Sequence, residues 1–259
     1  MSSSRIARPP RVTTAAIVAA GFGSRLNELT EQKPKGFLEL AGHTLIERSL
    51  DALRHFGITK VVVGTGYRAD FYERLAGRRG DMVCIHSDIF ATTSSMYTLY
   101  NMRSALEGPF LLLESDLLFE PSAIQTLLEN PHGDVVLASD ATGSGDEVYI
   151  ETTDAGGLVG MSKDKTKLGR VDAELVGISK ISDETYRGIC EVMEAALTTN
   201  PKLDYEGALV ELAKHRDIRV QRVDGLAWCE IDDSDHLEHA VTRILPRVQA
   251  AWRAKNEAA

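Results

Sequence analysis

The chain has 259 residues, of which 43% are hydrophobic and 26% are charged, and its formal net charge is −9. These values are typical of a folded globular protein with a sizeable core, so they exclude a disordered chain. The negative charge disfavours nucleic acid and anionic membranes as partners. Three widely spaced cysteines form neither a disulfide framework nor a metal knuckle, which favours a reducing cytoplasm.

The first half of the chain alternates apolar runs with amphipathic segments. Strands are expected in five short apolar runs, at 12–20, 60–67, 82–87, 109–116 and 134–139. Helices are expected in three segments with helical spacing of apolar residues, at 43–56, 70–76 and 94–106. This alternation predicts right-handed crossovers and an α/β fold that is Rossmann-like, with a mostly parallel central sheet flanked by helices.

The pattern changes after about residue 140. Short strands divided by glycine and charge are expected at 147–153, 156–163 and 173–182, then helices at 183–197 and 205–215. The chain is expected to end with strands at 218–223 and 227–231 and a helix at 235–252. We therefore predict a single domain over 13–246 with a small lid-like α+β insertion at about 141–216. A disordered leader (1–12) precedes it, and a helical or frayed tail (247–259) follows it.

A glycine-rich loop, AAGFGSRL, follows the first predicted strand. Ligands of such sheets bind at the carboxyl ends of the strands, where this loop lies. Glycine allows the backbone to approach a phosphate closely, so that successive N–H groups can point at its oxygens. The loop residues predicted to bind a nucleotide are Ala20, Gly21, Gly23, Ser24 and Arg25.

The residues after this loop narrow the choice of ligand. No Gly-Lys-Ser/Thr follows, which excludes a Walker A loop, and Leu26 occupies the third small position of a dinucleotide fingerprint, which disfavours an oxidoreductase. Arg25 can fork onto the outer phosphates of a triphosphate. Pro34 fixes the backbone before Lys35, which can hold an ammonium near the reacting phosphorus. The alternative is a surface turn with solvated cations.

Four segments resemble a known family. AAGFGSRLNELTEQKPKGFLELAG resembles the signature of the sugar-phosphate nucleotidyltransferase superfamily. SDIFATTSSMYTLYNMRSAL, LLLESDLLFE and WCEIDDSDHL are similar to the bacterial phosphocholine and 2-aminoethylphosphonate cytidylyltransferase branch. The resemblance covers the chain from about Thr14 to Leu245 and implies a GT-A-like nucleotidyltransferase fold. It also implies that Thr93, Ser94 and Ser95 adjoin the pyrimidine of CTP, although Ser94 and Ser95 can equally cap a helix.

Two aspartates, Asp116 and Asp232, each follow an apolar strand. If both strands lie centrally in the sheet, the two carboxylates converge beside the phosphate loop, where Mg²⁺ binds a few carboxylates together with phosphate oxygens and water. The resemblance places both at metal-ligand positions of the family. Asp233, the residue after Asp232, could replace it as a metal ligand. Asp235 is expected to cap the last helix. A helix cap or a turn is the alternative for a strand-end aspartate.

The activity that the resemblance implies is the transfer of CMP from CTP to a small phosphonate or phosphorylated amino alcohol, with release of pyrophosphate. We expect an in-line displacement at the α-phosphorus without a covalent enzyme intermediate. Lys35 and Arg25 are the predicted catalytic residues, because the reaction brings two anions together and needs cations to stabilise the developing charge.

The acceptor is predicted from the acids and aromatic residues of the insertion. Acids suit a primary ammonium, which donates hydrogen bonds that choline cannot donate. This favours 2-aminoethylphosphonate over phosphocholine. A solvated acidic turn is the alternative for the segment around residue 146. The predicted acceptor-binding residues are Asp146, Glu147, Tyr149, Tyr205 and Glu206.

Two other functions compete with this prediction. A sugar-1-phosphate nucleotidyltransferase would perform the same chemistry on a hexose phosphate, but the short insertion and the SSMYTL loop argue against it. A catalytically silent, nucleotide-binding regulatory subunit would not need the intact set of Arg25, Lys35, Asp116 and Asp232. A homodimer is possible through the long final helix, which can pack on its own sheet or on a second subunit.

Overall fold

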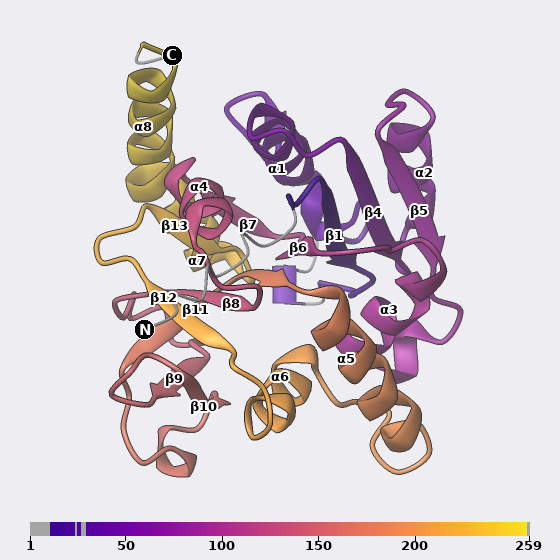
Figure 1. Ribbon diagram of the computed structural model, residues 1–259. Helices are drawn as coiled ribbons and strands as arrows, with labels where there is room; N and C mark the ends of the chain where they lie inside the picture. Colours follow the sequence, from indigo (N-terminus) through magenta and orange to yellow (C-terminus); the bar gives the residue numbers. More distant parts are fainter. Residues whose placement is uncertain (1–10, 24, 27–29, 258–259) are drawn as a thin grey trace.

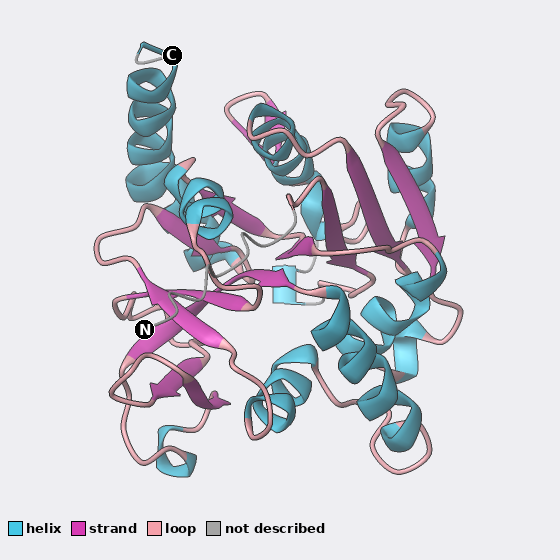
Figure 2. Cartoon of the chain, viewed as in Figure 1, coloured by secondary structure: helices cyan, strands magenta, loops and turns pink. Residues whose placement is uncertain are grey.

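The computed structural model describes residues 11–23, 25–26 and 30–257. The predicted nucleotide-binding residue Ser24 and residues 1–10 of the expected leader lie outside the described residues. The fold class is confirmed: a mixed, mostly parallel central sheet is flanked by helices (Figures 1 and 2). In the described part of the chain, this sheet contains nine strands.

One half of the sheet is entirely parallel. β1 (Thr14–Ala19) pairs with β4 (Lys60–Thr65) on one side and with β6 (Phe110–Glu114) on the other, and β4 pairs with β5 (Met82–His86). All six residues of β1 are buried, as expected for a strand covered on both faces. Because the strands run in the same direction, the chain leaves β1, β4 and β6 at one edge of the sheet.

The other half of the sheet is mixed. Its central strand, β11 (Ala173–Ile181), runs antiparallel to β6 and also pairs with β8 and β9. The remaining strands are β8 (Val135–Ser139), β9 (Tyr149–Thr152), β10 (Leu158–Ser162) and β12 (Arg219–Arg222). Within the expected insertion at about 141–216, β11 therefore lies inside the main sheet.

Helices cover both faces of the sheet, and each face has its own hydrophobic core. Alternate residues of β1 enter the two cores, because successive strand residues point to opposite faces: Ala15 and Ile17 enter one, Ala16 and Val18 the other. One face carries α1 (Leu45–His55), α2 (Ala69–Ala76) and α4 (Ser122–Glu129). The other carries α3 (Ser95–Asn101), α5 (Asp183–Ala196) and α6 (Tyr205–Ala213) (Figure 1).

Two small ribbons lie outside the main sheet. The hairpin of β2 (Glu39–Leu40) and β3 (His43–Thr44) leads into α1. β13 (Trp228–Glu230) pairs antiparallel with β7 (Leu117–Phe119), a strand that was not predicted. The condition set for convergence of the two aspartates, that both strands lie centrally in the main sheet, is not met by the 227–231 strand. Among the described residues, β13 has its only strand partner in β7.

The last helix is divided into three parts. α7 (Ser234–His239) continues into a π-helical turn, Ala240–Ile244, and then into α8 (Leu245–Glu257). Pro246 follows this turn and has no N–H to donate, which favours a local departure from α-helical pairing. The predicted cap is also corrected: the side chain of Asp233, rather than that of Asp235, accepts the N–H of His236.

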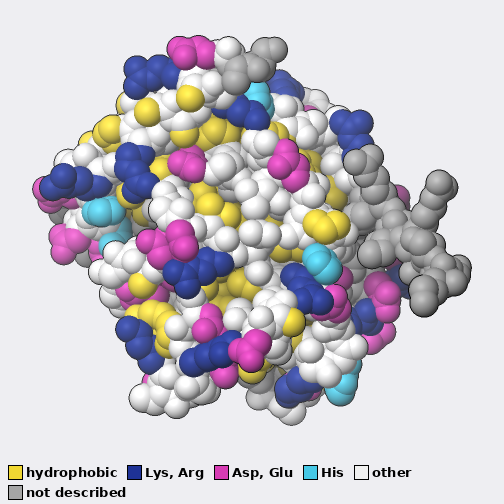
Figure 3. Space-filling view, turned by 60° about the vertical axis from the view of Figure 1, so that its left-hand side comes forward, with side chains coloured by type: hydrophobic (Ala, Val, Ile, Leu, Met, Phe, Trp, Pro, Cys, Tyr) yellow, Lys and Arg dark blue, Asp and Glu magenta, His cyan; other side chains and the backbone are white. Residues whose placement is uncertain are grey.

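The surface gives no indication of a polymer-binding stripe on the face drawn in Figure 3. There, among the described residues, basic side chains are interspersed with acidic ones. Within the described ranges, the structure also contains no helix that is long and apolar enough to cross a bilayer. The possible homodimer stays a prediction.

Candidate active site

A cavity of about 230 Å³ lies where the chain leaves β1 and β6. Its walls are the glycine loop after β1, the segment before α3 and the turn after β6. The structure brings together here six of the residues predicted to bind the nucleotide: Ala20, Gly21, Gly23, Thr93, Ser94 and Ser95. Ser94 does not cap α3 with its side chain, because its hydroxyl donates to the carbonyl of Leu203 at 2.6 Å.

Gly23 gives Lys35 its place in this cavity. The φ of Gly23 is +65°, a left-handed conformation that favours glycine. A Cβ at Gly23 would lie 2.7 Å from Cγ of Lys35, so the lysine stem packs directly against the glycine. The hydroxyl of Thr30 donates to the Gly23 carbonyl at 2.9 Å and closes the turn. The loop therefore aims the ammonium of Lys35 toward the acids beyond it.

Lys35 joins the two aspartates that the sequence predicts as metal ligands. Its Nζ donates to Oδ2 of Asp116 at 2.8 Å and also to Oδ1 of Asp232. Burial alone would lower the pKa of Lys35, but the charges of Asp116 and Asp232 outweigh burial and raise that pKa. Arg25 completes the group, with Nη2 2.8 Å from Oδ1 of Asp232.

The ribbon of β7 and β13 explains why the two aspartates meet. Leu117 pairs with Glu230, and the amide of Ile231 donates to the carbonyl of Asp116 at 3.2 Å. Asp116 thus precedes one strand of the ribbon while Asp232 follows the other. Both side chains are largely buried. Convergence of the two carboxylates was predicted, but through a different strand arrangement.

The acids of this region can hold a divalent metal. Carboxylate oxygens of Glu114, Asp116 and Glu230 lie within 4.8 Å of one another. Oδ2 of Asp232 is buried and has no hydrogen-bond partner among the described residues, so this oxygen is available to a cation. Oxygen donors of this kind suit Mg²⁺.

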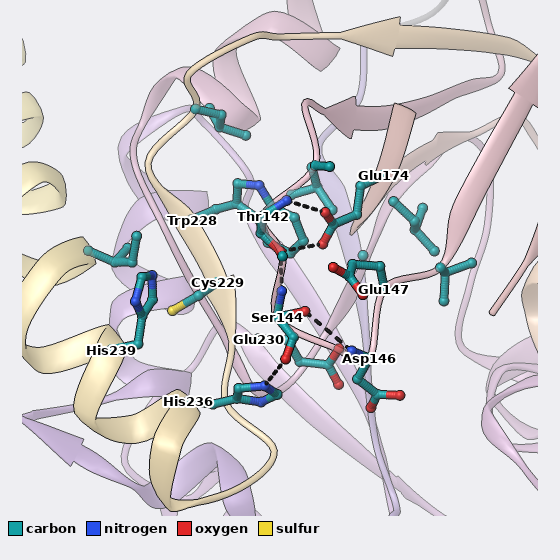
Figure 4. A pocket seen from close by; sticks show the side chains of 18 of the residues that line it. Thr142, Ser144, Asp146, Glu147, Glu174, Trp228, Cys229, Glu230, His236 and His239 are labelled. Carbon is teal, nitrogen blue, oxygen red and sulfur yellow. Dashed lines mark hydrogen bonds between the residues drawn. The ribbon is translucent and has the colours of Figure 1, made fainter. Parts of the chain in front are cut away.

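A second cavity, of about 920 Å³, adjoins these acids, and Glu230 is among the side chains drawn at its wall in Figure 4. It is bounded by β13, by α7 and the following turns, and by a loop after β8 that we call the 142–147 loop. Glu114 lines both cavities and Asp232 lines the larger one. The acids therefore stand between two spaces, as required for a reaction between two separately bound substrates.

The predicted acceptor residues fall into two groups. Asp146, Glu147 and Glu206 line the larger cavity, whereas neither tyrosine is part of its wall. The Tyr149 hydroxyl donates to Glu147 at 2.9 Å. Tyr205 is almost completely buried, and its hydroxyl donates to Glu114.

Asp146 and Glu147 already have partners within the protein. Asp146 accepts from Arg25 at 2.6 Å and from Lys163 at 2.7 Å. Burial would raise the pKa of Asp146, but these two cations outweigh it and lower that pKa to about 2. Glu147 accepts from Tyr149 and from the backbone amide of Gly145.

Four glutamates at the wall of the larger cavity have raised pKa values: Glu174 and the three with the larger shifts, Glu114, Glu206 and Glu230. Burial is the first cause for each, and the charges of neighbouring carboxylates add to it. The pKa is raised to about 7 for Glu114, to about 8 for Glu206 and to about 10 for Glu230. Oε2 of Glu206 is buried without a hydrogen-bond partner in the described part of the chain. A cation beside these carboxyls would favour their charged form, and the same cavity is also lined by Lys163, Arg243 and Arg247.

Four residues of the site were not predicted: Glu114, Lys163, Glu230 and His236. Two of them carry a signal in the sequence, because Glu-x-Asp occurs twice, at 114–116 and 230–232. Residues two apart in an extended segment point to the same side, so each glutamate accompanies its aspartate. Lys163 and His236 carry no comparable signal, since their partners come from distant parts of the chain.

Comparison with known proteins assigns the family. Residues 15–205 match the MobA-like NTP transferase domain. The chain belongs to this family of nucleotidyltransferases. The resemblance drawn from the glycine loop and the Pro-Lys pair is therefore confirmed.

Named relatives of this nucleotidyltransferase include cytidylyltransferases. It is 27% identical over 254 residues to the CMP-5'-(3-aminopropyl)phosphonate synthase of Streptomyces rubellomurinus, covering 93% of this chain but 40% of that relative's length. It is 24% identical over 220 residues to the choline-phosphate cytidylyltransferase of Streptococcus pneumoniae, covering 84% and 92%. The inositol-1-phosphate CTP transferase structure from T. maritima superposes with a TM-score of 0.79 at 17% identity, covering 93% and 98% of the chains. That likeness concerns the fold.

Proposed function

We propose that the protein is a CTP-dependent cytidylyltransferase that transfers CMP to a small phosphonate or phosphorylated amino alcohol and releases pyrophosphate. The observation that carries this proposal is the position of Lys35. Its ammonium contacts both Asp116 and Asp232 at the boundary between two cavities. The smaller cavity takes the nucleotide, and the larger one takes the acceptor.

The reaction is an in-line displacement. An oxygen of the acceptor phosphonate or phosphate forms a bond to the α-phosphorus of CTP, while the bond from that phosphorus to the bridging oxygen of pyrophosphate breaks. The electron pair of the broken bond leaves with pyrophosphate. Lys35 and Arg25 stabilise the charge that develops on the phosphoryl oxygens; Lys35 is largely buried and acts where water is excluded, whereas Arg25 reaches the site from its exposed side. The chain supplies no nucleophile.

Asp116 and Asp232 would hold Mg²⁺, with Glu114 and Glu230 close enough to contribute. The buried, unpartnered Oδ2 of Asp232 supports this assignment. When bound, the metal neutralises phosphate charge and orients the triphosphate. The ammonium of Lys35 contacts the carboxylates of Asp116 and Asp232. Lys35 is therefore positioned to move between these carboxylates and a phosphate oxygen.

The acceptor is proposed to carry a primary ammonium, with 2-aminoethylphosphonate favoured and phosphocholine next. Asp146 and Glu147 were predicted as its partners, but both already accept hydrogen bonds within the protein. Glu206, with its unpartnered Oε2, is the better candidate, and because its pKa is raised to about 8, a bound ammonium would favour its charged form. A primary ammonium can donate three hydrogen bonds to such a wall.

A substrate panel tests the proposal. Pyrophosphate release is measured with CTP, UTP, dTTP or ATP against 2-aminoethylphosphonate, phosphocholine, inositol 1-phosphate and glucose 1-phosphate, with MgCl₂ or with EDTA. We expect activity with CTP, MgCl₂ and an ammonium-bearing acceptor. Release with glucose 1-phosphate alone would identify a sugar-phosphate enzyme, and no release from any pair would identify a silent nucleotide-binding protein.

A further inference from the structure

His236 connects two parts of the site that are far apart in the sequence. It lies on α7, and its ring is mostly buried. The backbone amide of Asp232 donates to Nδ1 at 3.3 Å, and Nε2 lies 3.2 Å from the carbonyl oxygen of Ser144 (Figure 4). Because Nδ1 accepts a hydrogen bond, the proton is on Nε2, which donates to Ser144. The ring thus bridges the proposed metal-binding segment and the 142–147 loop.

The 142–147 loop needs such a bridge. Gly143 and Gly145, on either side of Ser144, have φ values of +73° and +93°, and no atom within 4 Å would meet a Cβ at either position. The loop is therefore not held in place by packing at these two residues. It is held by hydrogen bonds, beginning with Thr142, whose amide and hydroxyl donate to Glu174 at 2.6 and 2.8 Å.

The other end of the loop is held by a contact that the nucleotide is expected to compete for. Asp146 is bound by Lys163 and by Arg25, and Arg25 is also bound to Asp232. In the proposed function Arg25 binds the triphosphate, so its bond to Asp146 weakens when CTP binds. The bond from His236 to Ser144 involves neither substrate. It remains when Arg25 turns to the nucleotide.

We propose that His236 is a positioning residue that fixes the 142–147 loop against the Asp232 backbone and thereby shapes the acceptor cavity before the acceptor binds. The expected effect on acceptor binding rests on the proposed function. The expected effect on the order of the 142–147 loop does not. Loss of the bond to Ser144 leaves the CTP cavity intact, because neither His236 nor Ser144 is part of its wall. The acceptor then has to order the loop itself, which weakens its binding.

Three substitutions at His236 distinguish its hydrogen bond with the Asp232 amide from its hydrogen bond with the Ser144 carbonyl. His236→Ala removes both. His236→Asn keeps an acceptor near the amide of Asp232 but is too short to reach Ser144. His236→Gln provides an acceptor and a longer N–H donor, so it can restore the bridge. His215→Ala, at an exposed histidine in the turn after α6, is the matched control.

We expect His236→Ala and His236→Asn to raise the KM for 2-aminoethylphosphonate about five- to tenfold, the effect of one hydrogen bond, with the KM for CTP nearly unchanged. His236→Gln should recover most of the loss, and His215→Ala should resemble wild type. An unchanged acceptor KM in His236→Asn, or an equal rise in both KM values, would overturn the proposal.

Amide hydrogen exchange of the substrate-free proteins gives a readout that needs no activity. In His236→Asn the amides of residues 143–147 should exchange faster than in wild type, while those of β11 keep their protection. Equal exchange of the loop in both proteins would refute the bridge. An inactive wild-type enzyme with the expected exchange difference would refute the proposed function alone.

Discussion

The ammonium of Lys35 lies 2.8 Å from the carboxylate of Asp116, although 81 residues separate them in the sequence. Lys35→Ala should lower kcat about 10²–10³-fold, because a fixed cation near the reacting phosphorus acts mainly in the transition state. Pyrophosphate release at saturating substrates measures this. Lys202→Ala, at an exposed lysine, is the control. Turnover of Lys35→Ala near that of the control would show that the lysine has no catalytic role.

The same substitution should make stability depend on magnesium. Without Lys35, Asp116 and Asp232 lose the cation between them, so two buried carboxylates repel each other. Lys35→Ala should therefore have a lower Tm than wild type in EDTA, and MgCl₂ should raise its Tm by more degrees than it raises that of wild type. Thermal unfolding of both proteins with EDTA and with MgCl₂ checks this. An equal Tm increase in the two proteins would argue against a metal at these aspartates.

Gly23→Ala should reproduce the kinetic defect of Lys35→Ala. The added Cβ would lie 2.7 Å from Cγ of Lys35, and the φ of +65° disfavours any residue with a side chain. We expect a kcat at least tenfold below wild type. Gly80→Ala, in a turn with open space around it, is the matched control. If Gly23→Ala keeps full activity, the loop does not position the lysine.

The elements close to the first strand could be predicted from the sequence, because local patterns specify them. The helix after the β2–β3 hairpin, for example, begins with a capping box in which Thr44 and Glu47 bond each other's backbone amides. The ribbon of β7 and β13 was not predicted as a ribbon, because its two strands are three residues each and lie more than 100 residues apart. Short strands with a distant partner carry little periodic signal.

The residues of the candidate site differ in the same way: some stand in local motifs, and others depend on distant partners. Lys35, Asp116 and Asp232 stand in recognisable motifs, and the structure brings them together. Asp146 was predicted to bind the acceptor, and whether it is available for that role depends on which other side chains contact it. Its partners Arg25 and Lys163 come from the nucleotide loop and from the residue after β10, and neither contact follows from spacing along the chain.

Glu230→Gln should stabilise the protein at pH 8. The pKa of Glu230 is raised to about 10 in the folded chain, and its ordinary value is 4.5. Between these values the folded protein keeps a proton that the unfolded chain has lost, so the free energy of unfolding decreases as pH rises. Glu114, with a pKa of about 7, adds to this slope between pH 4.5 and 7.

The measurement is urea unfolding of wild type and Glu230→Gln at pH 5 and pH 8 in EDTA. The variant should lose less stability between the two pH values and should exceed wild type at pH 8 by about 1–3 kcal/mol. Glu107→Gln, an exposed substitution of the same kind, should follow wild type. Parallel pH dependence of wild type and Glu230→Gln would show that the carboxylates of the cavity do not strain the fold.

Glu206→Gln should change which acceptor the enzyme prefers. Its Oε2 is buried without a partner among the described residues and faces the acceptor cavity, so a primary ammonium is the group expected to use it. The pKa of Glu206 is raised to about 8, and a bound ammonium would favour its charged form. The substitution keeps the shape of the side chain and removes the group that can take this charge. The ratio of kcat/KM for 2-aminoethylphosphonate to that for ethylphosphonate, which lacks the ammonium, should fall about tenfold or more, because hydrogen bonds to charged groups are stronger than neutral ones. A decrease of the same factor for both acceptors would instead mean that Glu206 supports the site without recognising the ammonium.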